Sequence, residues 1–207
     1  GLDLPDEAIP ELAAYATILW AWNDRLNLTR HTDVQQFVQR DVIDTAAICP
    51  FMKTNERVLD VGTGGGVPGV VLAILRRDLT VELSDTSSKR IAALRSILDE
   101  IKLSLTIHHQ PAQQIAHDMN SQGHPFDTLI IRAVAPLPKL LAWFEPISSV
   151  YGRLLLIKGP RWEAEKQEAR HHGFLKKVTA RRIASWPIPG SDIESVLLEI
   201  KNRKNQQ

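Results

Sequence analysis

Short apolar runs alternate with longer helical patterns along most of the chain. The runs are rich in β-branched residues or leucine, and they predict strands at about 57–61, 80–84, 104–109, 127–132, 153–158, 177–184 and 194–201. Helical patterns fill the intervals, and residues 87–101 place an apolar stripe opposite a charged face. This alternation is typical of βαβ units, so the sequence predicts an α/β fold with a mostly parallel, seven-stranded sheet.

The first fifty residues follow a different pattern. Apolar residues recur there at helical spacing and predict two or more helices, among them Leu12, Tyr15, Leu19, Trp22 and Leu26. At 207 residues the chain has the usual size of one domain, and no repeat, low-complexity tract or Gly/Ser linker divides it. We therefore expect a single domain over 1–207, with an N-terminal helical extension over 1–50 and a Rossmann-like core over 51–207.

The cysteine content and the start of the chain narrow the class of protein. Cys49 is the single cysteine, which excludes an internal disulfide and a Cys-x-x-Cys site and fits a reducing compartment. The first residues are acidic and contain proline, unlike the basic stub and long apolar run of a signal peptide. We therefore expect a cytoplasmic protein with no membrane span.

The small net charge of +1 conceals an asymmetry. Residues 1–150 hold 13 Lys and Arg against 18 Asp and Glu, whereas residues 151–207 hold 12 against 6. A basic C-terminal third is able to attract a polyanion such as RNA, although a solvated surface with counter-ions explains the same composition. Both interpretations remain open at this stage.

A glycine-rich segment follows the first predicted strand. It begins at Asp60 and places Gly62, Gly64 and Gly66 where a backbone can turn sharply and approach a ligand at the carboxyl edge of a sheet. A dinucleotide-binding loop would have its third glycine at the position of Val67, so the match to a pyrophosphate site is imperfect. The pattern instead favours S-adenosylmethionine, and a glycine-rich turn without a ligand is the alternative.

Asp85 ends the second predicted strand, 19 residues after Gly66. An acidic side chain at this place is able to accept hydrogen bonds from ribose hydroxyls. On its own it would more often cap the following helix. Together with the glycine segment it favours ribose binding.

Two cations stand at the ends of later strands. Arg132 closes the strand at 127–132 and Lys158 the strand at 153–158, both at the predicted ligand edge. A buried guanidinium needs an anionic or carbonyl partner. That partner is either the cofactor carboxylate, a substrate oxygen or a structural carboxylate such as Asp60 or Asp127. We expect Arg132 to matter for turnover more than for folding.

Other chemistries find little support in the sequence. His108-His109 and His171-His172 are adjacent pairs, and neighbours on a strand face opposite sides, so neither pair makes a natural metal site. The chain has no Gly-x-Ser-x-Gly motif and no Gly-x-x-x-x-Gly-Lys-Ser/Thr motif. We therefore expect no metal ion and no covalent nucleophile.

Several motifs together resemble one family, the bacterial small-subunit rRNA guanine-N7 methyltransferases called RsmG or glucose-inhibited division protein B. The resemblance spans nearly the whole chain, and the segments that carry it are Trp22-Asn23, Asn27-Leu28-Thr29, Arg40 to Asp44, Leu59 to Gly69, Arg132 to Ala135 and Ile157 to Gly159. The glycine segment alone would fit any class I methyltransferase. The tetrad Arg132-Ala-Val-Ala135 makes the resemblance more specific.

The resemblance implies a class I fold and methyl transfer from S-adenosylmethionine to N7 of one guanine in the decoding region of 16S rRNA, either free or in the small ribosomal subunit. It places Lys158 near the substrate and implies that the cofactor contacts Gly62, Val67, Asp85, Thr86, Ser87, Ala112, Gln113 and Arg132. The chain departs from the family where a histidine, a glutamate and an arginine are usual and it has Asp41, Gln113 and Ser195.

Guanine N7 has a free lone pair, so its attack on the sulfonium methyl needs no general base and catalysis depends on positioning. Three alternatives remain: a methyltransferase of a small molecule or a protein, an RNA-binding module with a vestigial cofactor site, and an NAD-dependent enzyme. The basic C-terminal third disfavours the first, and intact Asp60, Gly64 and Asp85 disfavour the second. Val67 disfavours the third.

Overall fold

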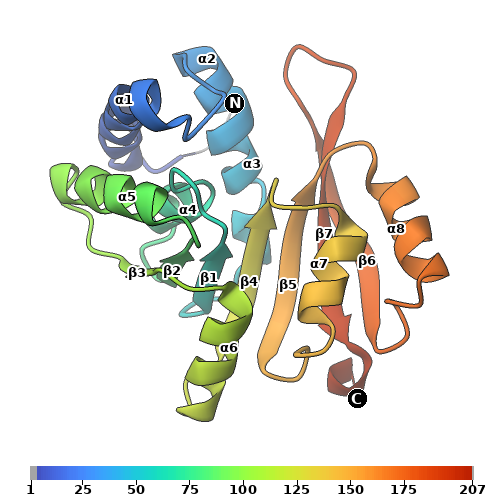
Figure 1. Cartoon of the computed structure of the whole chain (residues 1–207). Helices are drawn as coiled ribbons and strands as arrows, with labels where there is room; N and C mark the ends of the chain where they lie inside the picture. Colours follow the sequence, from blue (N-terminus) through green and yellow to red (C-terminus); the bar gives the residue numbers. More distant parts are fainter. Residues whose placement is uncertain (1–3, 207) are drawn as a thin grey trace.

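The structure, a computed structural model, describes residues 4–206, and they form a seven-stranded sheet in the order β3-β2-β1-β4-β5-β7-β6 (Figure 1). The strands are β1 (Arg57–Val61), β2 (Thr80–Ser84), β3 (Thr106–His108), β4 (Phe126–Arg132), β5 (Tyr151–Lys158), β6 (Val178–Pro187) and β7 (Glu194–Asn202). Neighbours from β3 to β5 pair in parallel, and β7 pairs antiparallel with both β5 and β6. The predicted mostly parallel sheet is confirmed. Its strand order reverses between β1 and β4, where such sheets bind ligands beyond the carboxyl ends of the strands.

Helices cover both faces of the sheet because each strand carries apolar side chains on both sides. One face is covered by α1 (Ala8–Leu26), α4 (Gly69–Leu75) and α5 (Ser88–Glu100). The other is covered by α6 (Ala112–Ser121), α7 (Leu137–Phe144) and α8 (Trp162–His171), as Figure 1 shows. The two buried clusters meet across the sheet, where Val58 faces the first layer and Leu59 the second. Within the described part of the chain, no helix has the length and apolar character needed to cross a membrane.

The N-terminal extension packs on the same face as α4 and α5. After α1 it consists of α2 (Val34–Gln36), the π-helix η1 (Phe37–Val42), α3 (Ile43–Ala46) and the 3-10 helix η2 (Cys49–Phe51). Tyr15 of α1 is fully buried, and its hydroxyl donates a hydrogen bond of 2.8 Å to the carbonyl of Gly65 in the glycine segment. The extension thus contributes to the core that covers this face of the sheet and supports the predicted site from one side.

Five strands differ from the predicted bounds, and β3 and β6 differ most, for physical reasons. The strand expected at 104–109 is shorter because β3 lies at the edge of the sheet and pairs only with the last residues of β2. The strand expected at 177–184 extends to Pro187 through an irregularity between Arg182 and Ala184. A bulge of this kind inserts an extra residue and shifts the alternation of side chains, so the later residues no longer follow the pattern that predicts a strand. A final 3-10 helix, η3 (Arg203–Gln206), follows β7.

Candidate active site

The glycine segment turns sharply after β1. Gly62 and Gly66 have positive φ angles of 68° and 111°, which favour glycine because it lacks a side chain. A Cβ atom at Gly62 would lie 2.8 Å from Cγ2 of Val134, and one at Gly66 would lie 2.6 Å from Cγ2 of Val70. Both positions therefore require glycine for conformation and for packing, and the turn is held tightly between β1, β4 and α4.

The side chain of Asp60, near the end of β1, forms hydrogen bonds with the glycine segment. The side chain is 1% exposed, and its Oδ2 accepts hydrogen bonds from Oγ1 of Thr63 at 2.6 Å and from the amide of Gly69 at 2.8 Å. Burial raises the pKa of Asp60 to about 6, although the hydrogen bonds from Thr63 and Gly69 oppose the shift. Its Oδ1 has no hydrogen-bond partner among the described residues. The carboxyl group therefore links both ends of the turn.

Asp85 links the glycine segment to α5. Its Oδ2 accepts a hydrogen bond of 3.1 Å from the amide of Gly64, and its Oδ1 accepts one of 2.8 Å from the amide of Ser87. Ser87 itself is the N-cap of α5, since its hydroxyl accepts the amide of Arg90. The N-cap of α5 is thus Ser87, and Asp85 accepts the amide of this capping residue. A carboxylate has about four acceptor positions, so Asp85 keeps capacity for a ligand.

Two cavities adjoin at the carboxyl edge of the sheet. One has a volume of about 530 Å³ and contains Asp85 in its wall, and we call it the Asp85 cavity. The other has a volume of about 730 Å³ and contains Arg132, and we call it the Arg132 cavity. Both are lined by Gly62, Arg90 and Ala133, so the two spaces meet beside the first glycine of the turn.

The structure distributes the predicted site residues between these cavities. The Asp85 cavity is lined by the predicted residues Gly62, Asp85, Thr86, Ala112 and Gln113. The Arg132 cavity is lined by the predicted residues Gly62, Gly64, Val67, Arg132 and Lys158. Three predicted residues line neither cavity, namely Asp60, Gly66 and Ser87. These three support the walls through hydrogen bonds and packing, and their predicted contact with the cofactor stays a prediction.

Arg132 is held by two carboxylates from the N-terminal extension. Its Nη1 lies 2.7 Å from Oδ1 of Asp41 and its Nε lies 3.4 Å from Oδ2 of Asp44. Its Nη2 also donates to the carbonyl of Arg40 at 3.1 Å. The suggested structural partners Asp60 and Asp127 were wrong. Asp127 lies near the opposite end of β4 and accepts the amide of Arg57, and Asp60 faces the glycine segment.

Asp41 and Asp44 are themselves 1% exposed and make further contacts. Nδ1 of His31 lies 2.8 Å from Oδ1 of Asp41, and the indole nitrogen of Trp186 donates to Oδ1 of Asp44 at 2.8 Å. Oδ2 of Asp41 has no hydrogen-bond partner among the described residues, although Asp41 lines the Arg132 cavity. Ser195, where the family usually has arginine, is buried on β7 and pairs with Trp186 in the ladder.

Lys158 is also paired. Its Nζ lies 2.6 Å from Oε2 of Glu165 on α8 and donates to the carbonyl of Ala135 at 3.2 Å. The same Oε2 accepts the amide of Leu137 at 2.7 Å. The lysine therefore ties β5 to α8 and to the segment that follows β4, and its side chain is only 12% exposed.

Some residues of the site gave no signal in the sequence. Ala133 has a positive φ of 56° and lines both cavities, a conformation that alanine rarely adopts and that no pattern predicts. Trp143 and Phe144 from α7 line the Asp85 cavity, and only the contacts of α7 with the sheet reveal this. The packing of the extension brings His31 and Asp44 into the wall of the Arg132 cavity, although the motif from Arg40 to Asp44 already marked that segment.

Cys49 lies outside both cavities, and burial raises the pKa of its thiol to about 11, which makes it a poor nucleophile.

The fold is shared with solved structures of methyltransferases. An O-methyltransferase from Bacillus cereus in complex with SAH has a TM-score of 0.58 at 17% identity and covers 93% of this chain and 91% of its own. An rRNA methylase from Streptococcus thermophilus has a TM-score of 0.53 at 16% identity and covers 79% of this chain and 96% of its own. These likenesses confirm the predicted class I methyltransferase fold.

Sequence comparison identifies the family. The model of the GidB family, described as rRNA small subunit methyltransferase G, matches residues 8–189. Ribosomal RNA small subunit methyltransferase G of Rhodopirellula baltica is 40% identical over 188 residues, which are 91% of this chain and 79% of the relative. The Escherichia coli protein of the same name is 34% identical over 204 residues, which are 99% of this chain and 94% of the relative. The chain therefore belongs to the rRNA small subunit methyltransferase G family, which confirms the predicted enzyme class and the predicted cofactor, S-adenosylmethionine.

Proposed function

We propose that this protein transfers the methyl group of S-adenosylmethionine to N7 of a guanine in 16S rRNA, in the cytoplasm, with either free rRNA or the small ribosomal subunit as substrate. The observation that carries the proposal is the pair of cavities that meet at Gly62 beyond the carboxyl ends of β1 and β4. A methyl donor and its acceptor must approach one another in line, and two adjoining spaces provide for this. Membership of the family supports the choice of acceptor.

In this proposal the nucleoside of the cofactor occupies the Asp85 cavity. Asp85 accepts hydrogen bonds from the ribose with the acceptor positions that Gly64 and Ser87 leave free. Thr86, Ala112 and Gln113 line the same space around the base. The amide of glutamine at position 113 both donates and accepts hydrogen bonds, whereas the glutamate usual in the family only accepts them.

The methionine part then passes Gly62 into the Arg132 cavity, where Gly64 and Val67 contribute to the wall. Gly62 has no side chain, which leaves the passage between the two cavities open. A Cβ atom at this position would also collide with Val134. The sulfonium carries a positive charge, and Asp41 and Asp44 stand in the same cavity. The guanine enters from the open side of this cavity, so that N7 faces the methyl group.

Arg132 serves in this site as a fixed hydrogen-bond donor rather than as a free counter-charge. Its guanidinium has five N–H groups, and hydrogen bonds to Asp41 and to the carbonyl of Arg40 engage one on Nη1 and one on Nη2, while Nε lies 3.4 Å from Asp44. The second N–H groups of Nη1 and Nη2 are available for O6 of guanine or for the cofactor carboxylate. Because three protein contacts hold the group, its orientation is set before the ligands bind.

The charge balance of the site suits the reaction. Methyl transfer moves a positive charge from the sulfonium to the guanine ring, and no proton has to leave N7. Arg132 and Arg40 lie within ion-pair distance of Asp41 and Asp44 in the same cavity, and these pairs reduce the repulsion that the two cations exert on a developing cationic base.

The test is methyl transfer from labelled S-adenosylmethionine to 16S rRNA and to small subunits from cells that lack the activity. We expect 7-methylguanosine when the product nucleoside is identified by mass spectrometry. A different methylated nucleoside would overturn the acceptor, and transfer to neither RNA would overturn the substrate class. Titration with S-adenosylmethionine and with NADH checks the cofactor separately, and binding of NADH alone would contradict the assignment.

A further inference from the structure

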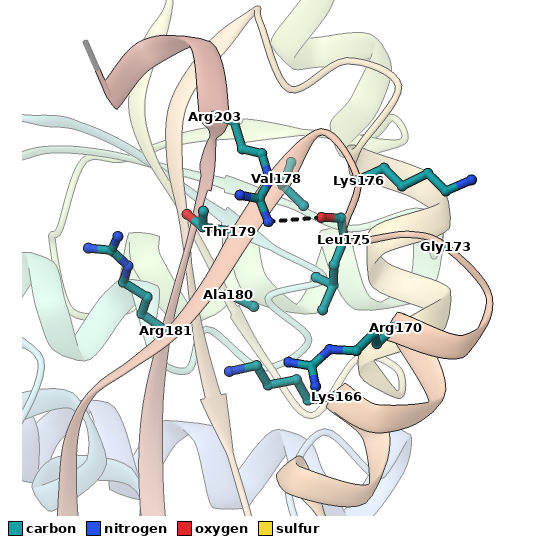
Figure 2. A pocket seen from close by; sticks show the side chains of 10 residues that line it. All are labelled: Lys166, Arg170, Gly173, Leu175, Lys176, Val178, Thr179, Ala180, Arg181 and Arg203. Carbon is teal, nitrogen blue, oxygen red and sulfur yellow. Dashed lines mark hydrogen bonds between the residues drawn. The ribbon is translucent and has the colours of Figure 1, made fainter.

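A third cavity, of about 410 Å³, lies away from the candidate active site. It is formed by α8, by the turn after that helix, by the first half of β6 and by the chain after β7, as Figure 2 shows. We call it the basic pocket, because all of its charged lining residues are cations, namely Lys166, Arg170, Lys176, Arg181 and Arg203. No acidic side chain of the described residues lines it.

Two of these cations lie side by side, and a third lies farther along the pocket (Figure 2). Figure 2 shows Lys166 and Arg170 extending from α8 toward β6, while Arg203 reaches across from the chain after β7. The guanidinium of Arg203 donates a hydrogen bond of 3.3 Å to the carbonyl of Leu175, which fixes its direction. Lys176 extends outward in the same view. The pocket thus presents two guanidinium groups and one ammonium group along its length, from two separate elements.

The positive charge of the basic pocket is not balanced by the residues that the structure describes. None of its five cations forms an ion pair with any of them. Glu145 pairs with Lys177 at 3.3 Å and Glu199 pairs with Arg153 and Lys201, while Glu163 and Glu168 of α8 do not line the pocket and form no ion pair with its cations. Like charges that face one cavity repel each other unless an external anion joins them, so the pocket favours an anionic ligand.

Helix α8 connects the basic pocket to the Arg132 cavity. Arg161, just before the helix, lines the Arg132 cavity, and Lys166 lines the basic pocket. Between them Trp162 has Lys166 at 5.7 Å and Arg182 at 6.0 Å from its ring centroid. At 1.5 Å per residue the helix carries cations from the mouth of the Arg132 cavity to Arg170 over roughly 14 Å. A single strand of nucleic acid can follow such a path of cations and an aromatic ring.

We propose that the basic pocket binds backbone phosphates of the RNA whose guanine is methylated in the Arg132 cavity. This rests on the proposed function. Arg170 and Arg203 offer planar donor forks that match phosphate oxygens, and Lys166 adds a point charge. Phosphate contacts carry no sequence information, so the pocket fixes the position and direction of the strand while the Arg132 cavity receives the base. In this arrangement, five of the cations that make residues 151–207 basic contribute to one phosphate-binding pocket.

The test compares the wild type with Lys166→Ala/Arg170→Ala in binding to labelled 16S rRNA at several salt concentrations. Each lost phosphate contact lowers the slope of log affinity against log salt by about 1, so we expect the slope to fall by about 2 and the affinity at low salt to fall roughly tenfold. Affinity for S-adenosylmethionine should not change. In methyl transfer the KM for RNA should rise, with kcat nearly constant at saturating RNA.

The matched control is Lys53→Ala/Arg95→Ala, which removes two exposed cations elsewhere and should leave the slope unchanged. A second variant, Arg203→Ala, removes a cation from another element and should lower the slope by about 1. Thermal unfolding of each variant shows that it is folded. An unchanged slope and affinity in both pocket variants would overturn the proposal.

Two further outcomes separate this proposal from its alternatives. Inorganic phosphate that stabilises the wild type but not Lys166→Ala/Arg170→Ala, while both bind RNA equally, would show a site for a free anion and would overturn the RNA proposal. If the wild type yields no 7-methylguanosine, the proposed function fails. The salt slopes still decide independently whether the pocket binds RNA.

Discussion

The Arg132 cavity and the basic pocket both contain several cations, yet their charges are arranged in opposite ways. In the cavity Arg132 lies between Asp41 and Asp44, and Lys158 lies against Glu165. In the basic pocket, no described carboxylate pairs with the cations. Burial accounts for the difference, because an unpaired charge removed from water is unfavourable by several kcal/mol, whereas a charge near the surface keeps its hydration. The buried cavity cations Arg132 and Lys158 are therefore fixed parts of the fold. The pocket cations, like the exposed Arg30 and Arg161 that also line the cavity, form no ion pair with the described residues and are available to an external anion.

The largest effect that this comparison predicts follows from Arg132→Ala. The change leaves Asp41 and Asp44 buried without their strongest cation, so we expect a loss of about 3 to 5 kcal/mol in the free energy of unfolding. Methyl transfer should fall by at least about tenfold, or ~1.4 kcal/mol of transition-state stabilisation. This changes the expectation from sequence, in which Arg132 mattered mainly for turnover. Denaturant unfolding and the methyl-transfer assay measure the two losses separately.

A paired variant separates stability from activity. Arg132→Met/Asp41→Asn removes a charge of each sign, so it should recover part of the lost stability, while activity stays low because the fixed donor is gone. Arg132→Lys keeps the charge but not the planar fork and should restore little activity. If Arg132→Ala had the stability and turnover of the wild type, the paired cations of the Arg132 cavity would be no more fixed parts of the fold than the cations of the basic pocket.

A smaller effect concerns Asp60, a buried carboxyl that lacks a cation within ion-pair distance among the described residues. Its pKa is raised to about 6, so the folded protein binds this proton more tightly than the unfolded chain does. The stabilisation from the protonated form is complete below about pH 4 and is lost as the pH rises through about 6. Relative to wild type, Asp60→Asn should therefore gain about 2 to 3 kcal/mol in unfolding free energy between pH 4 and pH 7.

Denaturant unfolding of both proteins at pH 4, 5, 6 and 7 checks this prediction. Thr63→Val is the control, because it removes one of the hydrogen bonds that oppose the shift and should raise the pKa further. A difference between wild type and Asp60→Asn that stays constant over this range would mean that Asp60 remains ionised when folded.

Asp85→Ala should have an effect of about 1 to 3 kcal/mol on binding of S-adenosylmethionine, because a carboxylate that accepts ribose hydrogen bonds is removed. Isothermal calorimetry measures this loss. Arg90→Ala is the matched control, since Arg90 lies 3.5 Å from Asp85 and lines both cavities but has no proposed contact with the ribose. Equal affinities for wild type and Asp85→Ala would exclude the ribose contact.

The parts of the molecule that the sequence predicted well depend on local constraints. β1 and β2 have the predicted bounds because strands covered on both faces appear as continuous apolar runs. The turn at Gly62 was predictable because a sharp turn after a strand requires glycine whatever the rest of the chain does. The edge strand β3 was less predictable, since it pairs on one side only.

The parts that were missed depend on contacts between distant segments. Arg132 and Asp41 are 91 residues apart, and only the packing of the N-terminal extension brings them together. The basic pocket likewise combines α8, β6 and Arg203, so counting charges predicted a basic C-terminal third without its shape. Asp41 was noted only as a departure from the family, and its role as the partner of Arg132 follows from the structure.

The smallest effect is expected for an exposed ion pair on the surface. It serves as the counterpart to the buried ion pairs of Arg132. Arg77 and Glu11 pair across α1 and the segment after α4, with side chains 50% and 41% exposed. Water screens such a pair and the side chains lose conformational freedom when they meet, so Glu11→Gln should cost about 0.2 to 1 kcal/mol. The loss should shrink when denaturant unfolding is repeated at about 1 M salt, where the screening length is only about 3 Å. The loss in Arg132→Ala should change much less with salt, because its partners are 1% exposed. If both losses depend on salt to the same degree, burial does not explain why the cations of the Arg132 cavity are paired.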